Sequence, residues 1–172
     1  ELNRIEDNDM IIRPGDFSLE DLWRTVLKRT ERYASANNVT VSFGAPQNLP
    51  PVHADEERIR VVVQHLLDNA IRYSVNGGTI IVVLEEKNNT VYCSVTDQGV
   101  GIAPEERKKI FSKFFRSSNV VKHQTEGSGI GLFICKAIIE HSGGSIGFSS
   151  EPDKGSVFWF SLPAGARTPA GQ

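Results

Sequence analysis

Two strand-like segments separated by only three residues most constrain the fold. Residues 79–86 and 90–97 are rich in β-branched side chains, and residues 87–89 between them include two asparagines. Because so short a connection cannot cross over a sheet, the two segments must pair antiparallel. The sequence therefore predicts a β-hairpin at residues 79–97.

Three other segments have helical periodicity. Residues 19–36 carry apolar side chains at intervals of three and four, after a possible cap at Ser18 with Asp21 three residues on. A second apolar stripe covers residues 59–71, with Asp55 as a plausible cap and Gly77-Gly78 as a stop. The third helix is expected from about residue 128 to 141.

The remaining patterns complete an α+β order. Residues 39–43, 145–149 and 156–162 are expected to be strands, and a short helical piece is expected near residues 104–111. The fold class predicted is α+β, a two-layer α/β sandwich with a mixed, mostly antiparallel sheet covered on one face by three helices. A doubly wound parallel sheet is the alternative, but strict strand–helix alternation is missing.

The length, net charge and cysteine content of the chain limit the classes of protein to which it can belong. The 172 residues fit one domain, expected at residues 17–163, after a linker at residues 1–16 and before a disordered tail at residues 164–172. A net charge of −2 argues against a general nucleic-acid binder, and no apolar run is long enough to span a membrane. Cys93 and Cys135 are expected to be reduced core thiols. The first residue is not Met, so a fragment is expected.

The first candidate site is one flank of the second helix. His65, Asn69, Arg72 and Tyr73 fall on one side of the apolar stripe. The amide oxygen of Asn69 can ligate a hard cation such as Mg²⁺, and Arg72 can meet a phosphate. Taken alone, the flank is more typical of a solvated helix edge.

Two glycine-rich segments follow. Asp97, Gly99 and Gly101 stand at the end of a strand, where the carboxylate can accept a hydrogen bond from an exocyclic amine such as adenine N6 and the glycines let backbone approach a ligand. An ordinary Asx turn is the alternative. Residues 127–131 open the third helix and form a potential anion site, although they match neither the Walker nor the Rossmann pattern.

In sequence order, these motifs supply a candidate metal ligand, a hydrogen-bond acceptor for a nucleotide base and a phosphate-binding segment. The chain resembles the ATP-binding catalytic domain of sensor histidine kinases, in the superfamily shared with gyrase, Hsp90 and MutL ATPases. Residues 65–74 resemble the family's N box, residues 97–102 its G1 box, residues 110–116 its F box and residues 127–132 its G2 box. The likeness covers about residues 17–163.

The resemblance implies the Bergerat fold, ATP with Mg²⁺ as cofactors, and transfer of the γ-phosphoryl group to a histidine. It implies that Asn69 is the catalytic residue and the Mg²⁺ ligand, that Asp97 reads adenine, and that residues 112–126 form a mobile lid. The nucleotide-binding set implied is His65, Asn69, Arg72, Tyr73, Asp97, Gly99, Gly101, Ile102, Phe111, Arg116, Lys122, Gly127, Ser128, Gly129, Ile130, Gly131 and Leu132.

Two features depart from the family pattern. The first N-box position is usually Asn and here is His65, and no phosphoacceptor motif surrounds any of the four histidines. The chain is therefore expected to be the catalytic fragment of a two-component kinase, with residues 1–9 ending a dimerisation helix. An ATPase clamp and an anti-sigma-type serine kinase remain alternatives, although His65 stands where a clamp would carry its glutamate base.

The family also implies partners and a location. They are a dimerisation and phosphoacceptor domain of the same kinase and a downstream response regulator, without nucleic acid or direct membrane contact. The fragment is expected to be monomeric and cytoplasmic, with a membrane anchor elsewhere in the parent protein left open.

Overall fold

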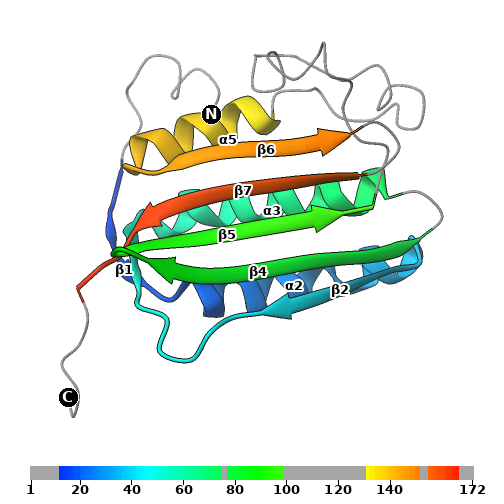
Figure 1. Cartoon of the computed structure of the whole chain (residues 1–172), viewed down its shortest axis with the longest axis horizontal. Coiled ribbons are helices and arrows are strands. Elements are labelled where there is room, and N and C mark those ends of the chain that lie inside the picture. The colour runs from blue at the N-terminus through cyan, green and yellow to red at the C-terminus, as the bar shows by residue number, and fades with distance from the viewer. Residues whose placement is uncertain (1–11, 75–76, 99–130, 152–154, 167–172) are drawn as a thin grey trace.

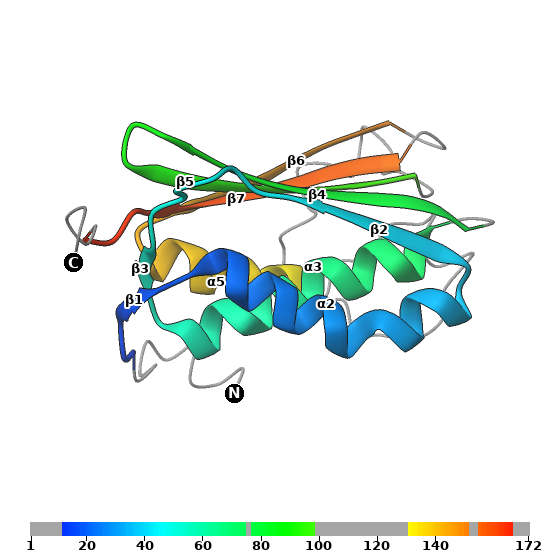
Figure 2. The same ribbon diagram turned by 90° about the horizontal axis from the view of Figure 1, so that it is seen from below.

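The computed structural model describes residues 12–74, 77–98, 131–151 and 155–166. Three helices form one layer and a five-stranded sheet forms the other (Figures 1 and 2). The helices are α2 (Leu19–Ala36), α3 (Glu56–Tyr73) and α5 (Gly131–His141). All three lie on the same face of the sheet, which confirms the predicted two-layer sandwich.

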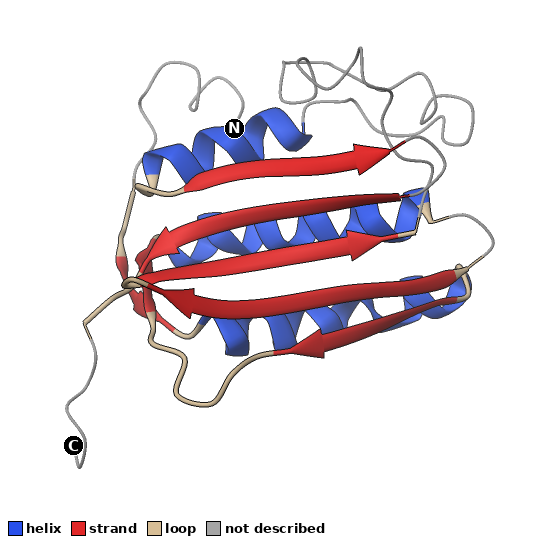
Figure 3. Cartoon of the chain, viewed as in Figure 1, coloured by secondary structure: helices blue, strands red, loops and turns tan. Residues whose placement is uncertain are grey.

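The five strands are β2 (Val39–Gly44), β4 (Gly78–Lys87), β5 (Thr90–Asp97), β6 (Ser145–Glu151) and β7 (Gly155–Pro163), in the order β2-β4-β5-β7-β6. β2 and β4 are parallel because α3 lies between them in the chain, and every other neighbouring pair is antiparallel (Figure 3). Asn88 and Asn89 form the predicted β4–β5 turn with φ values of 54° and 60°. This left-handed pair is typical of a tight hairpin.

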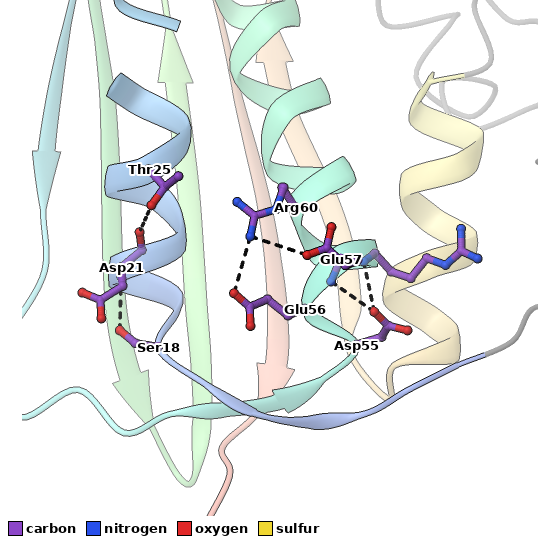
Figure 4. Close-up of polar contacts among 8 residues, drawn as sticks. Ser18, Asp21, Thr25, Asp55, Glu56, Glu57 and Arg60 are labelled. Carbon is purple, nitrogen blue, oxygen red and sulfur yellow. Dashed lines mark hydrogen bonds and ion pairs between the residues drawn. The ribbon is translucent and has the colours of Figure 1, made fainter. Parts of the chain in front are cut away.

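Side-chain caps fix where α2 and α3 begin (Figure 4). Ser18 Oγ accepts a hydrogen bond from the backbone N–H of Asp21 at 3.1 Å, and Asp55 accepts from those of Glu57 and Arg58 at 3.1 and 3.3 Å. Both caps were predicted. Each satisfies backbone donors that a helix start leaves unpaired and is worth about 1 kcal/mol.

The core lies between the helices and the inner face of the sheet. Trp23 and Phe160 are its largest fully buried side chains, and the whole apolar stripe of α3 is buried there. The predicted core thiols are confirmed, because Cys93 and Cys135 are both free and buried. On the outer face, Ile81, Tyr92 and Trp159 stay exposed.

Two short strands were not predicted from the sequence. β1 (Gly15–Phe17) pairs antiparallel with β3 (Val52–Ala54) at the end of the fold where β4 joins β5. Asp16 accepts hydrogen bonds from His53 Nδ1 at 2.7 Å and from the backbone of Ala166 at 3.3 Å. These contacts tie the first and last described segments together. In the part of the chain that the structure describes, no helix is long and apolar enough to cross a membrane.

Candidate functional site

The described parts of the three motifs meet at one end of the fold. β5 ends, β7 begins, α3 ends and α5 begins at the same end, opposite the β4–β5 turn (Figure 1). The antiparallel register places Asp97 at this end, and the length of α3 carries Asn69 and Tyr73 to it. Segments far apart in sequence thus supply side chains to one region.

The flank of α3 keeps its predicted character. His65, Asn69 and Tyr73 follow one another at intervals of four residues, so they form one row along the helix. All three are partly buried, beside the fully buried stripe and not within it. A substitution of Asn69 therefore removes little core packing.

Arg72 projects from the same last turn of α3 but contacts α2. Burial lowers its pKa, but the nearby hydroxyls of Tyr33 and Tyr73 outweigh that effect, and the pKa lies above its ordinary value. The guanidinium is therefore charged throughout the usual pH range. The Arg72 guanidinium can remain beside these tyrosines or bind an anion at the end of the helix.

His65 faces the first residue of α5. A Cβ placed on Gly131 would lie 2.9 Å from Nδ1 of His65 and 3.2 Å from Cε1. Burial lowers the pKa of His65, Arg72 lowers it further, and Asp68 opposes them. The imidazole is therefore neutral at pH 7, and it presents one donor and one acceptor.

Asp97 lies in a polar corner at the end of β5. Its side chain is only 6% exposed, and its register partner on β7 is Ser156 at 7%. Ser156 Oγ lies 2.8 Å from Ser150 Oγ on β6. A Cβ on Gly155 would lie 2.1 Å from the Asp97 carbonyl oxygen, so only glycine, here at φ 89°, permits this approach.

Ser156 and Ser150 were missed by the sequence analysis. Together with Asp97 they border a cavity of about 280 Å³. The strand that contains Ser156 was predicted, but its register with Asp97 depends on pairing across many residues. The only sequence signal was the Gly-Ser pair at the start of that strand.

Several predicted site residues lie outside the described part of the chain. They are Gly99, Gly101, Ile102, Phe111, Arg116, Lys122, Gly127, Ser128, Gly129 and Ile130, together with the expected helix near residues 104–111 and the lid at residues 112–126. Leu132, the last residue of the set, is partly buried and packs against the core.

The side chains available here suit a cation that is held partly by the protein and partly by a bound ligand. No cluster of three His, Cys, Asp or Glu side chains occurs among the described residues. Mg²⁺ is usually held by one or two protein oxygens together with substrate phosphates and water. The partly buried amide of Asn69 matches that pattern, whereas a cage built from protein alone does not.

Comparison with known proteins identifies the family of this chain. Residues 54–166 match the model of the family described as histidine kinase-, DNA gyrase B- and HSP90-like ATPase. The adaptive-response sensory kinase SasA of Synechocystis sp. is 40% identical over 147 residues, which are 85% of this chain and 38% of that protein. SasA of Prochlorococcus marinus is 33% identical over 90% of this chain and 41% of its own. The chain thus spans about two fifths of these relatives.

Solved structures share the same fold. The catalytic domain of histidine kinase ThkA, in a nucleotide-free form, has a TM-score of 0.77 at 32% identity and covers 88% of this chain and 98% of its own. Full-length ShkA in complex with AMPPNP has a TM-score of 0.82 at 28% identity over 97% of this chain and 35% of its own. The chain belongs to the family of histidine kinase-, DNA gyrase B- and HSP90-like ATPases, and within it to the histidine kinase catalytic domains with the Bergerat fold.

Proposed function

We propose that the chain is the ATP-binding catalytic domain of a two-component sensor histidine kinase. It binds Mg-ATP and transfers the γ-phosphoryl group to a histidine on a dimerisation domain outside this sequence. One observation carries the proposal: the buried Asp97, the Asn69 row of α3 and the start of α5 lie at the same end of the fold. Membership of the ATPase family supports the same ligand.

Each described residue has a role in this proposal. Asp97 accepts a hydrogen bond from adenine N6, and Ser156 beside it completes the polar end of the base pocket. Asn69 would hold Mg²⁺, which would supply positive charge to offset that of the phosphates. Arg72 can leave Tyr33 to meet phosphate oxygens. Gly131 and Leu132 begin the helix on the phosphate side.

In phosphoryl transfer a protein mainly orients its reactants and stabilises charge. The residues of this chain would therefore fix the nucleotide, while the attacking imidazole comes from the partner domain. The docking of that partner domain stays a prediction, and so does the lid at residues 112–126. The remaining nucleotide contacts also stay predictions; they are Gly99, Gly101, Ile102, Phe111, Arg116, Lys122 and residues 127–130.

The proposal includes the protein's context. A phosphoacceptor domain of the same kinase and a response regulator are its partners, the isolated chain is monomeric, and its location is cytoplasmic. The domain extends over residues 17–163 together with residues 15–16 and 164–166, which pair with it or form hydrogen bonds to it. The names of the sensory kinase relatives support this context.

Two measurements on the isolated chain test the proposal. Calorimetric titration with Mg-ATP should give a saturable heat with one site. Incubation with γ-labelled ATP should leave the chain unlabelled, because no phosphoacceptor motif is present. Absence of ATP binding would refute the nucleotide site, and acid-labile label on the chain would refute the external acceptor.

A further inference from the structure

His65 and Gly131 form a contact that the general nucleotide-binding scheme does not require. The two residues are far apart in sequence, and their contact joins the middle of α3 to the first residue of α5. His65 also occupies the position at which the sequence departs from the usual N-box asparagine.

The backbone of Gly131 does not itself require glycine. Gly131 lies within α5 and is not among the described residues with positive φ. Glycine is a poorer helix former than alanine. Its place in the glycine-rich segment and the close approach of His65 are the two features that favour glycine here.

The imidazole of His65 provides a reason. An added Cβ at Gly131 would meet Nδ1 at 2.9 Å and Cε1 at 3.2 Å, and the three heavy atoms nearest to it all belong to the His65 ring. His65 is partly buried, and its ring stands so close to Gly131 that an added methyl group would have to displace it. The imidazole of His65 therefore fills the space that a side chain at position 131 would need.

We propose that His65 is a positioning residue whose imidazole, packed on Gly131, sets the start of α5 against the Asn69 row of α3. The row continues from His65 to Asn69 one helical turn later, so a shift of α5 at this contact changes the distance between the two sides of the site. This inference rests on the proposed nucleotide function for its effect on affinity, but the contact itself does not depend on any ligand.

A double-mutant cycle isolates the contact. Gly131→Ala should weaken Mg-ATP binding about tenfold, because the added methyl group meets the His65 ring and displaces the start of α5 from its place against the Asn69 row. In the His65→Ala background the same methyl group meets no ring, so Gly131→Ala should change the affinity less than about twofold relative to His65→Ala alone. His141→Ala, which removes an imidazole from the exposed far end of α5, is the matched control and should bind ATP like the wild type.

Thermal unfolding without nucleotide tests the contact separately. Gly131→Ala should lower the melting temperature of the wild type and should raise or preserve it in the His65→Ala background, since alanine is the better helix former. Binding of adenosine, which lacks phosphates, should be the same for Gly131→Ala and the wild type, whereas a merely unfolded fraction would weaken both ligands.

The outcomes separate the inference from the proposed function. Rescue of both melting temperature and ATP affinity by His65→Ala supports the positioning role. Equal loss of ATP affinity in both backgrounds overturns it, because Gly131 would then be needed by the ligand and not by His65. If His65→Ala rescues the melting temperature of Gly131→Ala but the wild type binds no ATP, the contact is retained, its role in the site is overturned and the proposed function is refuted.

Discussion

Replacing Asp97 by asparagine removes one negative charge from the proposed adenine pocket while keeping the shape of the side chain. In the structure the carboxylate is 6% exposed, and Ser156 lies directly opposite on β7. Water therefore cannot readily replace a hydrogen bond that the variant loses. We expect the fold to persist, because no volume is added or removed.

The expected loss follows from the chemistry of the contact. A hydrogen bond to a charged group contributes about 1.5–3 kcal/mol. That range corresponds to a weakening of ATP binding by about 10- to 150-fold. Guanine presents an acceptor oxygen where adenine presents its amine, so the wild type should bind GTP more weakly than ATP by a similar factor.

Titration calorimetry with Mg-ATP and Mg-GTP measures both quantities, and thermal unfolding verifies the fold. Glu85→Gln is the matched control, because it removes a carboxylate from an exposed position on β4 in the same sheet. It should bind ATP like the wild type. Equal affinity of the wild type for ATP and GTP, or unchanged ATP affinity in Asp97→Asn with the control intact, would refute the assignment of Asp97.

Three further predictions concern the metal, pH and the thiols. Asn69→Ala should reduce the affinity gained from Mg²⁺ about tenfold, about 1.4 kcal/mol, with little change in melting temperature; a large fall in melting temperature would instead make Asn69 structural. Because the folded-state pKa of His65 is lowered, its contribution to stability is present above about pH 6.5 and is lost as the pH falls below it. Chemical denaturation at about pH 7.5 and 5.5 should show that the free energy of unfolding falls more for the wild type than for His65→Asn between these two pH values. Equal falls in the two proteins would contradict this. Burial raises the pKa of Cys135 to about 12 and raises that of Cys93, so a thiol reagent should react with neither until denaturant is added.

Local patterns were sufficient to predict most elements of the fold. The apolar stripe of α3, the caps Ser18 and Asp55 and the asparagine turn between β4 and β5 are each determined by neighbours within a few residues. The two three-residue strands β1 and β3 were missed because so short a segment shows no periodicity. Their pairing depends on partners in distant segments.

The site shows the same division between local and distant information. Asn69 could be placed on its helix flank from spacing alone, and Asp97 at the end of its strand. The pairing of Asp97 with Ser156, the proximity of Arg72 to Tyr33 and that of His65 to Gly131 could not be predicted. Each of these depends on how elements pack, and a single sequence carries no record of that packing.

The central claim is that the end of the fold where β5 and α3 finish binds Mg-ATP. The most direct measurement is a nuclear magnetic resonance titration of the ¹⁵N-labelled chain with Mg²⁺ and a non-hydrolysable ATP analogue. The account predicts that the amide signals of Asn69, Asp97 and Gly131 shift with a common saturation curve, while those of the β4–β5 turn stay fixed. Shifts confined to other regions, such as the groove of about 530 Å³ between α2 and β2, or no shifts at all, would contradict it.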